Sequence, residues 1–202
     1  MQNKQLYIRQ FCEITKQNLK LNGEVIHSSD SEDFNHFAKE IYTDQQWNYP
    51  KFYKMDALSK LAFIASELVL ENHHVPDTAI LFANRSASLD TDCKHQTSIA
   101  SETDYYPSPA VFVYTLPNIT IGEVSIRHDL KSESIFLVDE TYPAELVHLQ
   151  ANYLLSSKKA TQVLCGWVDY FQNKYQAFVY LVGEEGNYPL TNKFINERIK
   201  HL

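Results

Sequence analysis

The segment SPAVFVYTLPNITIGEVSI occupies residues 108–126, and its second half predicts a helix over residues 117–128. Pro117 stands in the first turn of that helix, where proline is tolerated because the first backbone N–H groups have no intrahelical acceptor. The apolar run that follows, Ser134–Asp139, has the length and composition of a buried strand. A helix followed closely by a strand is therefore predicted for the middle of the chain.

Strands and helices alternate on both sides of this pair. The strongest helix signal is residues 56–72, where apolar residues recur at a spacing of three to four and Asp56 can cap the first turn. Further helices are predicted at 32–41, 89–100, 142–157 and 190–201, and further strands at 5–14, 78–83, 162–168 and 177–182. This alternation predicts an α/β fold, with a mixed, mostly parallel sheet and helices on both faces, in a single domain spanning residues 1–202.

The composition excludes several classes of function. The chain has 202 residues and a formal charge of −7, which argues against a general nucleic-acid binder. Only five glycines are present, and none lies in a phosphate-binding array. The histidines and the three cysteines have no metal-ligand spacing, so neither a metal nor a cofactor is expected. Without a long apolar run or a secretory leader, we expect a cytoplasmic protein with no membrane span.

Two motifs resemble the β-ketoacyl synthase family of the thiolase-like superfamily. The TLPN motif at residues 115–118 is followed by a glycine four positions later, and MDALSKLAF at 55–63 resembles a helix of the same family. The resemblance covers residues 50–170 best and implies a thiolase-like half-fold. It also implies structural roles for the family-motif residues Phe112, Pro117, Asn118 and Gly122.

The resemblance also locates the position of the family's catalytic cysteine. Aligning residues 135–138 with the strand that precedes this cysteine places Thr141 at the nucleophile position. A hydroxyl is a far weaker nucleophile than a thiol unless a base activates it. The neighbouring carboxylates of Asp139 and Glu140 would repel a developing oxyanion. The family's two catalytic histidines belong to a second half, which we expect this chain to lack. We therefore predict a stand-alone amino-terminal-half form with no catalytic residue.

The resemblance implies partners as well. Ketoacyl synthases dimerise through the strand that precedes the nucleophile, so Ile135, Phe136, Leu137 and Val138 are predicted to pair with a second subunit. We expect a homodimer, or a heterodimer with a full-length ketoacyl synthase. An acidic acyl carrier protein could dock on local cations, for which Arg127, Lys131, Lys158 and Lys159 are the candidates. The predicted function is an accessory subunit in bacterial fatty-acid, polyketide or aryl-polyene-type pigment biosynthesis.

Two other functions remain open at this point. The first is a thioester hydrolase or acyltransferase of altered chemistry that uses Thr141 with a nearby acid or base, for which His148 is one candidate. The second is a homodimer that binds an acyl ligand in a pocket left at the former catalytic position. The three hypotheses differ in whether Thr141 becomes acylated and in whether the partner is a synthase.

Overall fold

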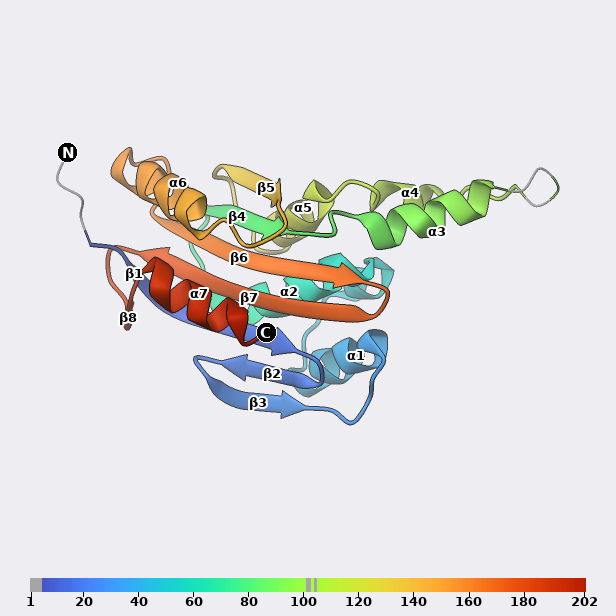
Figure 1. Cartoon of the computed structure of the whole chain (residues 1–202), viewed down its shortest axis with the longest axis horizontal. Coiled ribbons are helices and arrows are strands. Elements are labelled where there is room, and N and C mark those ends of the chain that lie inside the picture. The colour runs from blue at the N-terminus through green and yellow to red at the C-terminus, as the bar shows by residue number, and fades with distance from the viewer. Residues whose placement is uncertain (1–4, 101–102, 104) are drawn as a thin grey trace.

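The fold is built on one mixed sheet. The computed structural model describes residues 5–100, 103 and 105–202, and within these residues eight strands join in the order β3-β2-β1-β7-β6-β4-β5, with β8 paired to β1 (Figure 1). The strands are β1 (Tyr7–Thr15), β2 (Asn18–Leu21), β3 (Glu24–Ser28), β4 (Thr78–Asn84), β5 (Ser134–Val138), β6 (Gln162–Phe171), β7 (Lys174–Gly183) and β8 (Tyr188–Pro189).

The α/β class and the mixed sheet are confirmed, but the expected majority of parallel pairs is wrong. Two strand pairings in the described chain are parallel, that of β4 with β5 and that of β4 with β6. The other pairings among the described strands are antiparallel. The tight turn at Gln172 and Asn173, both with positive φ, accounts for the β6–β7 pairing, because a two-residue turn can join only antiparallel strands. The β1–β7 pairing instead joins strands that are far apart in the chain.

Helices cover both faces of the sheet, as expected. One face packs against α1 (Phe34–Asp44), α2 (Ala57–Leu70) and α5 (Asn118–Arg127), and the other against α6 (Ala144–Ser156) and α7 (Asn192–Lys200). The helices α3 (Leu89–Ile99) and α4 (Pro109–Val113) pack on each other and extend past the end of the sheet (Figure 1). A 3₁₀ turn, η1 (Pro50–Lys54), precedes α2.

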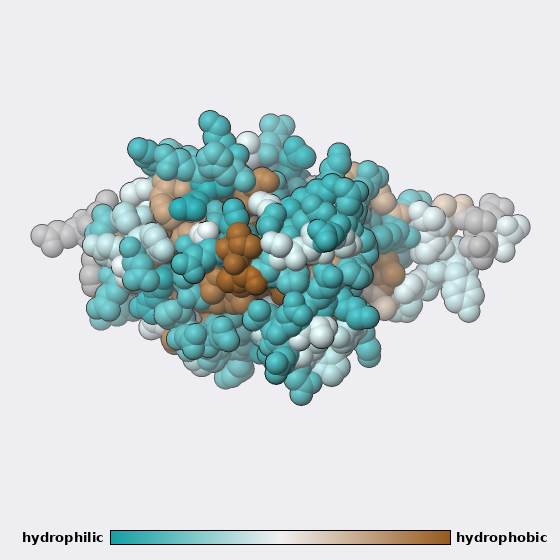
Figure 2. Space-filling view, turned by 90° about the horizontal axis from the view of Figure 1, so that it is seen from below, coloured by the Kyte–Doolittle hydropathy of each residue, from teal (hydrophilic) through white to brown (hydrophobic). Residues whose placement is uncertain are grey.

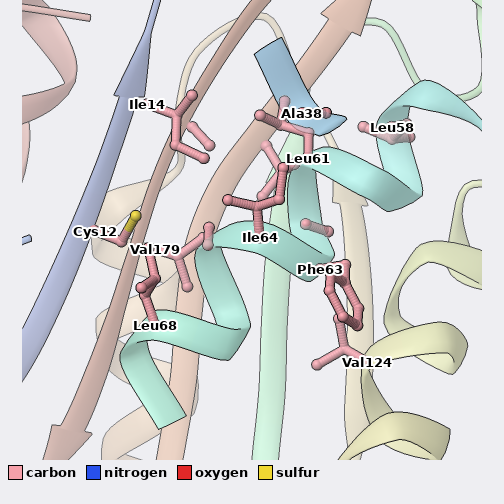
Figure 3. Packing of buried hydrophobic residues seen from close by; sticks show 14 of the residues in the cluster. Cys12, Ile14, Ala38, Leu58, Leu61, Phe63, Ile64, Leu68, Val124 and Val179 are labelled. Atoms are coloured by element: carbon pink, nitrogen blue, oxygen red, sulfur yellow. The ribbon is translucent and has the colours of Figure 1, made fainter. Parts of the chain in front are cut away.

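The central helix α2 follows directly from the sequence pattern. The Asp56 side chain caps it by accepting the Ser59 backbone N–H at 2.9 Å, which satisfies one of the free donors of the first turn. Its apolar residues then lie against β1, β7 and α5; Figure 3 shows Leu61, Ile64 and Leu68 toward Ile14 and Val179, and Phe63 toward Val124. The packing of this helix on the sheet forms the larger of the two cores.

The strand β5 lies at one end of the sheet. It is hydrogen-bonded to β4 alone among the described strands, and its residues are half-buried or exposed rather than fully buried. The edge position that the predicted pairing with a second subunit requires is confirmed, whereas the expected burial on both faces is wrong, because the two cores cover this strand only in part. No helix in the described part of the chain is long and apolar enough to cross a membrane.

Candidate functional site

The segment around Thr141 connects β5 to α6. The backbone N–H of Asp139 donates to the carbonyl of Asn84 at 2.9 Å and so extends the pairing with β4 by one residue. The chain then turns through Glu140 and Thr141, and α6 begins at Ala144. The chain thus forms a strand, a turn and a helix here, and the side chains of Asp139, Glu140 and Thr141 are all exposed.

Bulky side chains fill the interior beneath this turn. Tyr142 is buried, its hydroxyl lies 2.8 Å from that of Tyr180, and its ring meets the Trp167 ring edge-on with a centroid separation of 6.1 Å. Burial raises the pKa of both Tyr142 and Tyr180 well above the usual value, so neither phenol ionises near neutral pH. The aromatic groups packed around Tyr142 are therefore neutral.

Thr141 lacks the base that an alcohol nucleophile requires. Among the described residues its hydroxyl has no hydrogen-bond partner, and the nearest histidine in sequence, His148, is instead directed to Asn192 of α7 with an Nδ1–Oδ1 distance of 3.4 Å. The Cys165 thiol is fully buried, and burial raises its pKa, so it supplies no thiolate. Within the described chain, this region has no activated nucleophile.

Polar groups at the carboxyl ends of β4 and β6 were not foreseen from the sequence. The Asp169 carboxylate of β6 accepts the backbone N–H groups of Arg85 at 3.2 Å and Ser86 at 2.9 Å, and this holds the loop that follows β4. The Arg85 side chain is exposed, and it forms no ion pair with any residue the structure describes. The sequence carried one signal for these groups, since Asn84 directly follows the predicted strand 78–83. The carboxyl ends of parallel strands meet at one edge of the sheet, so polar residues just beyond them are expected to lie close together.

The outer edge of β5 presents unpaired backbone groups. In a parallel ladder, alternate residues direct their N–H and C=O groups to opposite sides. The Glu133 carbonyl and the Asp139 N–H both bond to β4, so the odd-numbered residues face β4. The backbone groups of Ser134, Phe136 and Val138 consequently point away from the sheet and are available to another strand.

Apolar side chains flank this edge on both faces of the sheet. On the α6 face, Ile135 and Leu137 join the second core and line a cleft of about 70 Å³ together with Leu146. On the α5 face, Phe136 packs on the first core. Exposed apolar residues continue along the same border of the molecule in α5, β5 and α6, namely Ile126, Val138, Leu146, Leu149 and Tyr153. This border therefore combines unpaired backbone groups with exposed apolar side chains.

The opposite edge of the sheet differs from β5. Figure 2 shows this side of the molecule as largely hydrophilic, with a hydrophobic patch near its middle. The exposed apolar residues of β3 are Val25 and Ile26. The pairing of β3 with β2 is interrupted by a register shift between Leu19 and Lys20. Irregularities of this kind are a common protection of sheet edges against further pairing, and no such irregularity interrupts the β4–β5 pairing.

Two of the predicted docking cations, Arg127 and Lys131, lie in different surroundings. The Arg127 guanidinium donates to both carboxylate oxygens of Glu67, at 2.6 and 2.9 Å, and stacks over the rings of Tyr49 and Phe63. It therefore serves the protein interior and is not a free surface cation. Lys131 is exposed and lies 3.1 Å from Asp129, a contact of the kind that solvent screens strongly.

The family-motif residues are not explained by packing inside the chain. Phe112 is 59% exposed, with His95 as its ring neighbour, and Asn118 is exposed at the start of α5. Pro117 precedes the first residue of α5, next to the position expected. A Cβ added to Gly122 would meet nothing within 4 Å, so this position needs no glycine for its own fold. Within the described residues, no group of three or more acidic, histidine or cysteine side chains could hold a metal.

Comparisons with known proteins identify the fold. No family model matches the sequence, and no curated protein matches it. Solved structures match over most of the chain. The ishigamide ketosynthase/chain length factor aligns with a TM-score of 0.69 and 16% identity, over 92% of this chain and 64% of that one. A ketosynthase in complex with its chain length factor from Xenorhabdus doucetiae aligns with a TM-score of 0.61 and 15% identity, over 91% and 80%.

A third structure adds a carrier protein to the comparison. It is a type II acyl-carrier protein in complex with its ketosynthase, and the match has a TM-score of 0.67 and 12% identity, over 97% of this chain and 65% of that one. The chain thus spans slightly under two thirds of two of these three proteins. Identities of this size show the fold alone. The expected thiolase-like fold, shared with ketosynthases, is confirmed.

Proposed function

We propose that this chain is a non-catalytic, chain-length-factor-like subunit that pairs through β5 with an active ketosynthase of the same fold. The observation that carries the proposal is that, among the described strands, β5 is an edge strand with one free side and is followed by a turn that contains the exposed Thr141. The process served would be the assembly of a fatty-acid, polyketide or aryl-polyene-type chain, with an acyl carrier protein as a further contact. The proposal is supported by the solved structures of this fold that contain a ketosynthase with its chain length factor.

The chemistry around Thr141 supports the absence of catalysis. Acyl transfer needs an activated nucleophile and donors that stabilise the oxyanion. Here the hydroxyl is hydrogen-bonded to no base among the described residues, and two exposed carboxylates precede it. The missing base leaves the hydroxyl unactivated, and the two carboxylates oppose the build-up of negative charge that accompanies attack on a thioester.

The first prediction concerns covalent chemistry. We expect no acyl adduct when the protein is incubated with acetyl-CoA, malonyl-CoA or acyl carrier thioesters and examined by intact-protein mass spectrometry. The exposed free thiol of Cys93 could become acylated nonspecifically, so the experiment uses a Cys93→Ser variant as background. An adduct that persists in this variant and is lost in Cys93→Ser/Thr141→Ala would refute the proposal and establish the acyltransferase or hydrolase alternative.

The second prediction concerns the partner. Full-length ketosynthases of the same genome are co-expressed one by one with this chain, and the complex is isolated through a tag on the synthase. We expect Val138→Pro to abolish the complex, because proline removes an outward N–H from the edge of β5. Val138 is 55% exposed, and its N–H does not bond to β4, so the fold should tolerate the change.

The matched control for this experiment is Val138→Thr, which keeps both the N–H and the branched shape. We expect it to bind the synthase about as well as the wild type does. Equal binding by Val138→Pro would place the interface elsewhere. Self-association of the wild type with no synthase complex would favour the homodimeric acyl-ligand-binding alternative.

A further inference from the structure

The outward backbone groups of β5 define one best register for pairing with a second copy of the same strand. Antiparallel strands place residues with outward groups opposite one another. Pairing all three such residues requires Ser134 opposite Val138 of the other copy, and Phe136 opposite Phe136, about a two-fold axis. In this register the residues just beyond the strand also meet, with Glu133 of each copy opposite Asp139 of the other.

Both of these flanking residues are acidic and lie on the same face of the sheet. The alternation of side chains places Glu133 and Asp139 on the face of Ile135 and Leu137, beside α6. Glu133 is partly balanced by Lys159, with an Nζ–Oε1 distance of 2.8 Å, whereas Asp139 has no ion pair with a described residue. Self-pairing would therefore create the same like-charge contact twice, at the two ends of the paired strands.

We infer that the charges flanking β5 select against a homodimer and select a partner whose own edge strand is flanked by lysine or arginine. This inference rests on the proposed function and specifies the partner that it requires. A register shifted by two residues would bring Lys131 opposite Asp139, but it gives up one of the three hydrogen-bonded residue pairs. Like charges directly opposite each other destabilise strand pairs, and opposite charges stabilise them.

The inference is tested by changing the charges without any partner present. Asp139→Lys places a lysine opposite Glu133 of a second copy, so we expect this variant to form a homodimer at least about tenfold tighter than any self-association of the wild type. Sedimentation velocity at low ionic strength measures this change. Added salt should weaken the dimer because the new contacts are near the surface.

Two further variants make the result specific. Glu140→Lys carries the same change in net charge, but its side chain is one position further along and opposite Ser132, so it should remain as monomeric as the wild type. Glu133→Lys/Asp139→Lys restores like charges at both ends of the pairing and should abolish the dimer that Asp139→Lys forms. Equal dimerisation of Asp139→Lys and Glu140→Lys would overturn the inference, as would a wild-type homodimer that Val138→Pro disrupts.

These outcomes are separate from those of the proposed function. If Asp139→Lys stays monomeric while Val138→Pro still abolishes synthase binding, the charge selection is wrong and the accessory function stands. If Asp139→Lys forms the expected dimer and no synthase binds the wild type, the charge selection stands and the accessory function is wrong.

Discussion

Glu67→Ala is expected to lower the free energy of unfolding by about 3 kcal/mol, because it removes a buried carboxylate and leaves the partly buried Arg127 without its partner. The Glu67 side chain is 7% exposed, and it receives the Arg127 guanidinium on both oxygens and lies 3.0 Å from His128 Nε2. Urea denaturation followed by circular dichroism measures the change. Glu71→Ala, at the exposed end of the same helix, should change the stability by less than about 0.5 kcal/mol.

The same carboxylate predicts acid sensitivity. Burial alone would raise the pKa of Glu67, but the contacts with His128 and Arg127 outweigh it, and the pKa is lowered. A lowered folded-state pKa means that the contribution is present above the unfolded value and is lost as pH falls through the folded value. Wild-type stability should therefore decline below about pH 4.3 more steeply than that of Glu67→Ala. Parallel curves for the two proteins would contradict this role.

Phe63→Ala is expected to cost about 3–5 kcal/mol through the cavity that it leaves. The ring is 1% exposed and lies among Tyr49, Phe52 and Trp47, with centroid distances of 5.7, 5.3 and 5.6 Å. Figure 3 shows it on the side of α2 that faces Val124 of α5. Thermal unfolding monitored by calorimetry is the measurement.

Phe63→Leu provides the comparison, because it keeps most of the apolar volume and should cost less than the alanine variant. Tyr53→Ala serves as the second control, since that ring is 55% exposed and forms the outer part of the same aromatic group. A loss for Tyr53→Ala as large as that for Phe63→Ala would show that the aromatic group, rather than the buried ring, holds η1 against α2.

Both of these variants bear on the proposed interface. Glu67 and Phe63 of α2 contact Arg127 of α5, and α5 supports the inner face of β5 through the first core. A variant that loosens α5 would be expected to lower synthase binding together with stability. Binding should therefore be compared at temperatures where each variant is fully folded.

Local pattern was enough to predict most elements of this fold. The apolar spacing and the cap at Asp56 predicted α2, and Thr191 caps α7 as expected, its hydroxyl accepting the Phe194 N–H at 3.1 Å. The alignment of a short strand placed Thr141 just beyond β5, and the structure has the strand, turn and helix there. These features depend on residues close together in the chain, which is why periodicity and capping chemistry predict them.

Contacts between distant residues could not be predicted in the same way. The sequence could not show that Arg127 reaches Glu67, 60 positions earlier, and so turns from a surface cation into part of the interior. It could not show that β1 lies antiparallel to β7, since strand order depends on which surfaces pack together after the helices have formed. The residue types around Thr141 made catalysis improbable from the sequence alone. Only the tertiary structure decided which backbone groups of β5 face outward between Glu133 and Asp139, because that depends on which residues of β5 bond to β4.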